Sequence, residues 1–406
     1  MSETKSNVPK LRFPGFTDPW EQRKLGDCGT TFSGLTGKTR DDFGHGNAHF
    51  VPYTNVFDNP VADPGRLEAV EIDDYQTCVR CGDVFFTTSS ETPDEVGMSS
   101  VWLSDQQNVY LNSFCFGYRQ DGSFDSFYLA HTLRSPAFRS QIKLLAQGIS
   151  RFNISKRKVM ELAVRAPRID EQRAIGALFR GVDDLITLRQ RELERTKLMK
   201  RGLLQKMFPK AGADVPEWRF PGFTDPWEQR KLGDCFAESD ARSSDLEILS
   251  VGVSDGVYPA SESDRDTNPG ASIANYKVVE RGDIVYNSMR MWQGAVDVSR
   301  YKGIVSPAYV VAKPKAEAVS SFFSRLLKRS DLLNQYRRFS QGNSKDTLVL
   351  KFEAFSAIPA FIPANIKEQE QIAAAFDSLD DLITLRQREL DHAKLLKKAL
   401  LQQMFV

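Results

Sequence analysis

The sequence predicts an α+β protein with two tandem domains, separated by two long helices that pair as an antiparallel coiled coil with pseudo-two-fold symmetry. Two repeats lead to this prediction. Residues 183–193 return letter for letter at 380–390, and residues 12–28 return unaltered at 219–235. The stretches between these repeats differ. The chain is therefore two copies of one unit, in which an opening segment, a variable middle and a long helix follow one another.

This plan divides the chain into four segments. We expect a first variable domain at residues 12–167, a first spacer helix at 168–211, a second variable domain at 212–364 and a second spacer helix at 365–406. The opening segments, 12–28 and 219–235, allow two structures. Asp18, Pro19 and Glu21 would start a short helix, whereas residues 22–25 could equally form a strand.

Both helical stretches, 171–208 and 368–405, carry a heptad stripe of apolar residues. The stripe consists of Ile175, Leu178, Phe179, Val182, Leu185, Ile186, Leu193, Met199, Leu203 and Met207 in the first copy, and of Ile372, Ala375, Phe376, Leu379, Leu382, Ile383, Leu390, Leu396, Leu400 and Met404 in the second. A helix of ~38 residues is about 57 Å long, which is too long to cover its stripe on a small domain. We therefore expect the helices to cover each other, with the variable domains at opposite ends of the rod.

Arg189 and Arg386 interrupt the two stripes midway. A polar residue at such a position fixes the register of a coiled coil at some cost in stability. The alternative is two separate amphipathic helices on separate cores, which leaves the equal lengths and the identical central segments unexplained.

The variable middles follow one plan with different residues. Short apolar runs broken by turn residues predict strands, at 84–86, 109–111 and 114–116 for example, and helical spacing appears from 127 to 145. Three landmarks recur between the copies: 82–86 corresponds to 282–286, 126–128 to 321–323, and 147–151 to 341–345. We infer one fold that carries two different surfaces.

Composition sets broad limits on function. The chain has 406 residues, 41% of them apolar, and a net charge of +1, so any surface for nucleic acid must be local. No apolar run is long enough to span a bilayer, and the first residues do not form a secretion signal. Five scattered cysteines indicate free thiols in a reducing compartment, which predicts a cytoplasmic protein without membrane contact.

No catalytic motif emerges from the sequence. The glycines at 34 and 37 lack the spacing of a phosphate-binding loop, and Cys78 and Cys81 form a lone C-x-x-C pair without a second pair at zinc spacing. An adenine methyltransferase would carry an Asn/Asp-Pro-Pro-Tyr/Phe motif, and no Pro-Pro occurs. We therefore expect neither an enzyme nor a metal site in this chain.

Polar and basic residues in glycine-rich loops are the candidates for DNA contact. Arginine, asparagine and glutamine can recognise base edges, whereas lysine and serine mostly bind phosphates. The candidates are Lys38, Thr39, Arg40, Ser150, Arg151 and Asn153 in the first copy, and Asn287, Arg290, Gln293, Asn343, Ser344 and Lys345 in the second.

The order of these motifs, given twice, resembles the specificity subunit of type I restriction–modification systems. The resemblance covers nearly the whole chain. It rests on the opening segments with Trp20 and Trp227, on the Gly-Asp pairs before a strand, on residues 147–150, and on Pro167 and Pro363 leading to a Glu-Gln pair and a long helix. One departure is that residues 341–345 lack the isoleucine and arginine of the first copy.

The resemblance implies that each middle is a target-recognition domain for one half of a split sequence in double-stranded DNA. The helices would set the spacing and bind two modification subunits, which methylate adenine with S-adenosylmethionine. Two restriction subunits would join for translocation and cleavage with ATP and Mg²⁺, so no cofactor is expected in this chain. The rival hypotheses are an enzyme acting alone on DNA and a coiled-coil adaptor without DNA specificity.

Overall fold

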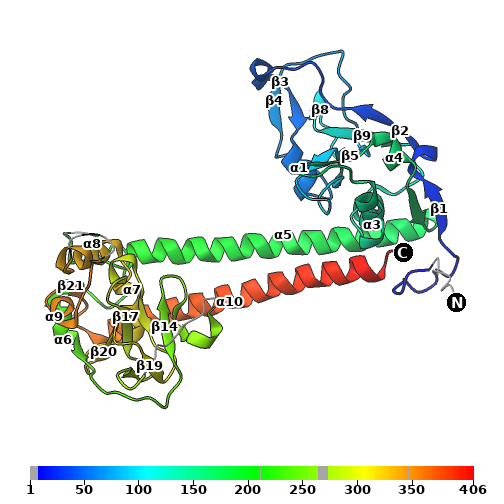
Figure 1. Cartoon of the computed structure of the whole chain (residues 1–406). Coiled ribbons are helices and arrows are strands. Elements are labelled where there is room, and N and C mark those ends of the chain that lie inside the picture. The colour runs from blue at the N-terminus through cyan, green and yellow to red at the C-terminus, as the bar shows by residue number, and fades with distance from the viewer. Residues whose placement is uncertain (1–7, 211, 264–272, 343, 345–346) are drawn as a thin grey trace. The chain divides into compact units, whose positions relative to one another are not determined.

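The computed structural model describes residues 8–210, 212–263, 273–342, 344 and 347–406 (Figure 1). The chain forms two compact units. The first consists of Met1–Arg191 with Arg388–Val406, and the second of Glu192–Gln387. Each unit therefore contains one variable domain and one part of each long helix.

The first unit combines short strands with helices. Its helices are α1 (Tyr53–Asp58), α2 (Ser126–Thr132), α3 (Pro136–Leu145), α4 (Lys156–Met160) and the first part of α5 (Ile169–Lys206), with 3-10 turns η1 (Leu25–Asp27) and η2 (Arg40–Asp42). Its strands are β1 (Glu21–Lys24), β2 (Gly29–Ser33), β3 (Phe43–Val51), β4 (Glu68–Val70), β5 (Val84–Thr87), β6 (Ser89–Ser90), β7 (Ser99–Val101), β8 (Val109–Leu111), β9 (Cys115–Gln120), β10 (Phe152–Asn153) and β11 (Ala163–Ala166).

The second unit repeats this mixture. Its helices are α6 (Leu232–Cys235), α7 (Ser320–Leu326), α8 (Ser330–Phe339), α9 (Phe352–Ser356) and the first part of α10 (Ile366–Gln403), with 3-10 turns η3 (Ala260–Glu262) and η4 (Met291–Gln293). Its strands are β12 (Glu228–Lys231), β13 (Phe236–Glu238), β14 (Leu249–Gly252), β15 (Gly256–Pro259), β16 (Lys277–Val279), β17 (Ile284–Asn287), β18 (Val296–Val298), β19 (Gly303–Val305), β20 (Tyr309–Pro314) and β21 (Pro359–Ile362).

Both units share one sheet frame, which confirms the predicted α+β repeat. The order β2-β9-β5-β7 in the first unit matches β13-β20-β17-β18 in the second, with antiparallel neighbours throughout. The central strands β5 and β17 are buried because their apolar residues face the core on both sides. Around this frame the units differ: the first adds the sheet β4-β3-β8, and the second adds the pairs β14-β15 and β16-β19.

The opening segments form strands, which settles the alternative that the sequence left open. β1 pairs antiparallel with β11, and β12 with β21, so each opening segment is tied to the strand before a long helix. The helical region expected at 127–145 is two helices rather than one. Ser135 caps α3 and Pro136 occupies its first turn, and a proline there prevents a helix from continuing through it.

The end of one long helix completes the main core of each unit. Phe405, in the last residues after α10, packs in the first unit with ring centroids 5.7 Å from Tyr128 and 5.4 Å from Phe179. In the second unit Phe208, after α5, lies 5.6 Å from Phe322 and 5.9 Å from Trp227. The core of each unit is thus completed by the end of the long helix that begins in the other unit.

These aromatic contacts correct one predicted correspondence. Tyr128 and Phe322 occupy the same place against the helix-end ring, and α2 and α7 begin at Ser126 and Ser320. The alignment of 126–128 with 321–323 was therefore wrong by one residue. Two adjacent phenylalanines in the second copy hid the shift, because both registers place an aromatic residue at this position.

The Glu-Gln pair at the start of each long helix ties the helix to its unit. Arg12 donates two hydrogen bonds to Glu171, at 2.6 and 2.7 Å, and Arg219 does the same to Glu368, at 2.6 and 2.8 Å. Both glutamates are buried. Such bidentate, charge-assisted bonds fix geometry as well as stabilise the contact. Gln172 and Gln369 bond the backbone before α2 and α7 in the same way.

Within each unit the parts of the two long helices run antiparallel, as predicted (Figure 1). Among the predicted stripe residues, those buried are Ile175, Phe179, Val182, Leu193, Met207, Ile372, Phe376, Leu379, Leu390 and Met404, and those half-buried are Leu178, Ile186, Leu203, Ala375, Leu382, Ile383 and Leu400. Leu185, Met199 and Leu396 are exposed, so for these three the predicted stripe was wrong. The buried contact between the helices therefore covers a narrower face than the heptad count indicated.

The arginines that interrupt the stripes bind across the helix pair. Arg189 forms an ion pair with Glu389 at 3.1 Å. Arg386 donates to the Glu192 carbonyl and to the Thr196 hydroxyl, both at 2.6 Å. These contacts favour one register of the helices, since a slip would leave the guanidinium groups without these partners.

Within the described residues, no helix has both the length and the hydropathy to cross a membrane.

An aspartate in the repeated helical segment anchors each variable domain to the helix pair. In the first unit Asp183 lies 3.3 Å from His131 of α2 and 2.6 Å from Lys397 of α10. In the second unit its counterpart Asp380 binds Arg325 of α7 at 2.8 Å and pairs with Lys200 of α5. The two anchors share one design, but only the first contains a histidine.

Replacing the ring at the end of α10 should unfold the first unit selectively. Phe405→Ala removes a buried ring from a packed aromatic cluster, which typically costs about 3–5 kcal/mol. We expect urea unfolding followed by hydrogen exchange to show this loss in residues 8–191 and not in the second variable domain. Leu395→Ala, on an exposed face of the same helix, is the matched control and should change stability by less than about 0.5 kcal/mol. Equal losses in the two variants would contradict the packing role.

The His131 anchor should make the first unit acid-sensitive. Burial lowers the pKa of His131; Asp183 opposes this shift, and Lys397 and Arg134 add to it. The unfolded chain then binds the proton more tightly, so the contribution of His131 to stability is complete above pH ~6.5 and is lost as the pH falls below that value. Burial alone would raise the pKa of Asp183, but His131 and Lys397 lower it, so its carboxylate stays ionised in this range.

We expect the free energy of unfolding of the first unit to fall as the pH drops below about 6.5, by up to about 1.4 kcal/mol per pH unit, the slope for one proton. Urea titrations at several pH values measure it. His131→Gln removes the titrating group and should flatten the curve. An unchanged slope in this variant would assign the effect to other groups.

Candidate nucleic-acid interface

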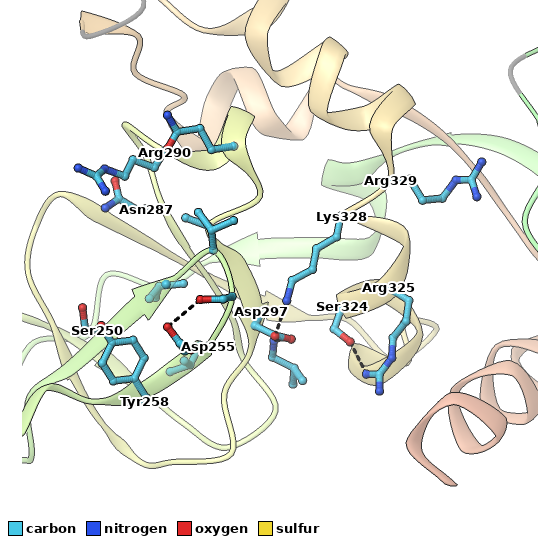
Figure 2. Close-up of a pocket in the computed structure, with 18 of the residues that line it drawn as sticks. Ser250, Asp255, Tyr258, Asn287, Arg290, Asp297, Ser324, Arg325, Lys328 and Arg329 are labelled. Atoms are coloured by element: carbon cyan, nitrogen blue, oxygen red, sulfur yellow. Dashed lines mark hydrogen bonds and ion pairs between the residues drawn. The ribbon is translucent and has the colours of Figure 1, made fainter. Parts of the chain in front are cut away.

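A cleft of about 2180 Å³ opens in the second unit (Figure 2). Its walls come from the β14–β15 hairpin, from residues 287–301 around β18, from residues 200–210 at the end of α5, and from residues 324–331 between α7 and α8. Three of the predicted DNA-contacting residues line it: Asn287, Arg290 and Gln293. The fold thus joins these candidates to a part of the long helix.

The three candidates belong to one braced loop at the end of β17. Within residues 287–295 the backbone amide of Asn287 bonds the Ala295 carbonyl at 3.0 Å, and that of Arg290 bonds the Asn287 carbonyl at 3.0 Å. The indole of Trp292 donates to the Met289 carbonyl at 3.2 Å, while Met291 is fully buried. These contacts hold the loop in one shape and leave Arg290 and Gln293 exposed. Figure 2 shows Asn287 and Arg290 close together.

The cleft carries an excess of positive charge. Among the described residues, eight cationic side chains and five carboxylates line it. Several cations are held by acids: Lys200 pairs with Asp380, Lys210 with Glu217, Arg325 with Asp377 and Asp380, Lys328 with Asp297, and Arg329 with Asp331. Arg201, Arg290 and Arg300 have no ion pair with any residue that the structure describes. The arrangement suits a polyanion, with fixed ion pairs in the walls and free guanidinium groups for the ligand.

A second loop lies beside the end of the same strand in both units. Gln147 and Asn153 exchange two backbone hydrogen bonds, at 3.0 and 2.9 Å, and Gln341 and Val349 do so at 3.0 and 2.8 Å. Next to them, Ile154 bonds the Thr88 carbonyl and Leu350 bonds the Ser288 carbonyl. The backbone of the loop is therefore anchored alike in both copies, although the sequence departs in the second. Ser344 bonds Thr347 within its loop, and the candidates Asn343 and Lys345 lie outside the described residues.

In the first unit this loop carries an arginine. Arg151 donates to the Ser89 hydroxyl at 3.2 Å, Asn153 pairs with Ser89 through β10 and β6, and Ser150 is exposed at the tip. The positions that correspond to Met289 and Arg290 of the second unit are Ser89 and Ser90 in the first unit. The two units thus present arginine from different elements of the same frame.

The remaining candidates form a separate cluster. Lys38 pairs with Asp73 at 2.8 Å, and this partner raises the pKa of Lys38. Thr39 bonds Asp42 through its amide and its hydroxyl, at 2.6 and 2.8 Å, while Arg40 is exposed. No hydrogen bond or ion pair between described residues joins this cluster to Arg151. Lys38 and Thr39 are engaged within their own loop, which leaves Arg40 as its free cation.

The Gly-Asp landmarks have a structural role. Asp83 accepts the Arg80 amide at 2.7 Å and pairs with Arg119 at 2.7 Å, and Asp283 accepts the Glu280 amide at 2.9 Å. Burial raises the pKa of Asp283, which has no such arginine. Both aspartates close the turn that leads into a central strand, so these residues position the adjacent loops.

Sequence reasoning missed the cleft residues that come from outside the glycine-rich loops. Arg201 lies on the helix and Arg300 follows β18. Neither residue belongs to a recognisable motif, and a single arginine on a helix rich in charged residues gives no sign of a binding site. One indication was present, since Arg201 and Lys398 keep a positive charge at the same place of the repeated helix.

Taken together, the fold is that of a tandem protein with one frame, two different polar faces and a shared pair of antiparallel helices. No protein-family model matches the sequence. A protein of Methanocaldococcus jannaschii, assigned as the specificity subunit of the type I restriction enzyme MjaX, is 22% identical over 431 residues, covering 97% of this chain and 95% of that protein.

Solved structures agree. The type I restriction–modification S subunit from M. genitalium has a TM-score of 0.59 at 14% identity, covering 98% of this chain and 99% of that one. A chain from a structural work on assembly and conformational transition of the type I R-M system has a TM-score of 0.51 at 16% identity, covering 97% and 98%. The fold is therefore that of type I specificity subunits, and the resemblance inferred from the repeated frame is confirmed.

Alanine at the glycine of either anchored loop should distort it. Gly148 and Gly342 have φ of +142° and +143°, and an added Cβ would lie 2.0 Å from the Arg151 carbonyl oxygen and 2.4 Å from that of Thr347. We expect Gly148→Ala and Gly342→Ala each to destabilise its own unit by about 1–3 kcal/mol in thermal unfolding. The control Gly181→Ala has open space on α5 and should be neutral or slightly stabilising. Normal stability in the loop variants would show that the loops relax freely.

Proposed function

We propose that this chain is the DNA-recognition subunit of a type I restriction–modification complex, and that each unit binds one half of a bipartite DNA target. One observation carries the proposal: an identical frame presents two different polar faces. A protein that bound the same sequence twice would repeat its faces together with its frame. The near-complete overlap with type I specificity subunits in sequence and fold supports the same function.

The two half-sites are bound by different chemistry. In the first unit Arg151, Ser150 and Asn153 are the contacts we propose, with Arg40 from the separate cluster. In the second unit they are Asn287, Arg290 and Gln293, together with the cleft. Arginine favours guanine and asparagine or glutamine favours adenine in the major groove. Because arginine comes from different loops in the two units, the order of bases in the two half-sites should differ.

The helices dock two copies of one partner. Leu188 and Leu385 occupy the same place in the repeated helix and are 52% and 53% exposed. Leu198 and Leu395 are a second such pair, each 64% exposed. Each unit contains one leucine of each pair. Apolar side chains repeated with equal exposure favour two equal contacts, as two modification subunits would make.

The chain recognises DNA and leaves the chemistry to its partners. Adenine methylation with S-adenosylmethionine belongs to the modification subunits, and translocation and cleavage with ATP and Mg²⁺ to two restriction subunits. The sequence supports this division, because it contains no Asn/Asp-Pro-Pro-Tyr/Phe motif. The alternative, a coiled-coil adaptor without DNA specificity, accounts for the helices but not for the free arginines of the cleft. Absence of salt-dependent DNA binding by the assembled complex would favour that adaptor.

Exchanging the second variable domain should change half of the target. We expect a chain whose residues 236–363 come from another specificity subunit to direct methylation to a sequence altered in one half only. Sequencing of methylated adenines in cells that carry the whole system measures this. The reciprocal exchange of residues 29–167 is the matched control and should change only the other half. If both halves changed together in either chimera, the modular assignment would be wrong.

A further inference from the structure

Two free arginines of the cleft belong to elements of different kinds. Arg290 lies in the variable loop after β17, and Arg201 lies on α5, which is part of the repeated frame. Both are exposed, both line the cleft, and neither has an ion pair with a described residue. Their guanidinium groups are therefore available to one ligand from two walls.

Arg290 is suited to recognise a base. Its loop is fixed by the backbone hydrogen bond between Asn287 and Ala295 and by the hydrogen bond from Trp292 to Met289. The backbone that carries the guanidinium is therefore rigid before DNA binds. Binding then costs little ordering of the backbone. A guanidinium has a planar fork of donors that matches the O6 and N7 acceptors of guanine, and this is the commonest specific contact in the major groove.

Arg201 is suited to hold a phosphate. A helix shared by both repeats cannot follow a sequence preference that changes with the variable domain, so its contact must be with what all DNA has in common. Its counterpart in the second helix is Lys398. The repeat therefore keeps the positive charge of Arg201 but not the planar arrangement of its donors. A phosphate contact requires only the charge, whereas a base contact requires the arrangement of donors as well.

We propose that the two arginines divide the work in this cleft: Arg290 recognises a guanine in the half-site of the second unit, and Arg201 holds the DNA backbone whatever its sequence. The spacer helix is then itself a DNA-contacting element as well as a spacer. This inference rests on the proposed function and adds to it a base, a phosphate contact and the residue responsible for each.

The test uses the complex assembled with its modification subunits and duplexes that carry the methylated target, with each base pair of the second half changed in turn. Arg290→Ala should weaken binding to the target roughly 5- to 150-fold and abolish discrimination at one G·C pair. Arg290→Lys should not restore that discrimination, because lysine lacks the planar fork.

Arg201→Ala should weaken binding to every duplex by a similar factor and reduce the slope of log affinity against log salt by about 1. Arg201→Lys should restore both quantities. Arg338→Ala removes an exposed charge from α8 outside the cleft and should leave affinity and slope unchanged. Thermal unfolding of each variant confirms that the fold is intact.

Three results would overturn the division of work: a second half-site without guanine, a base preference altered by Arg201→Ala, or a uniform loss with a smaller salt slope for Arg290→Ala. Each leaves the proposed function standing, provided the unmodified complex binds its target in a salt-dependent way. Failure of that binding would count against the proposed function itself.

Discussion

The packing of a helix end into the core of the other repeat is the constraint on which the rest of the structure depends. Phe405 completes the core that Trp20 and Tyr128 begin, and Phe208 completes the core of Trp227 and Phe322. Because each ring is supplied by the helix of the opposite copy, the helices must run antiparallel and their lengths must match.

Around that core the frame is held by polar contacts that repeat in kind. The Arg12–Glu171 and Arg219–Glu368 clamps fix where each helix leaves its unit. Asp183 and Asp380 fix where each variable domain meets the helix pair. Buried charged groups are costly without partners, so these positions tolerate little change. The exposed side chains of the loops at the ends of β5 and β17 are not buried charges of this kind, so they can differ between the copies.

In the proposed function, this division between frame and loops is what lets one fold serve two half-sites. The two glycine loops share the same kind of backbone anchor, a pair of hydrogen bonds at their ends, while their sequences differ. The exposed arginine beside the strand end is Arg151 in one unit and Arg290 in the other. In the cleft, most cations are neutralised by fixed acids, and a few free guanidinium groups remain for the ligand. Affinity can then come from the constant helix and sequence preference from the variable loop.

The sequence by itself determined the tandem plan, the helix pair and the central strands, because repeats and periodicity record local structure directly. Single-residue registers depend on packing: the match of Tyr128 with Phe322, the break before Pro136 and the exposure of Leu185 and Met199 were decided by neighbours distant in the chain. The cleft was also decided by tertiary structure. Arg201 and Arg290 stand far apart in sequence, and only folding places a helix charge and a loop charge around the same opening.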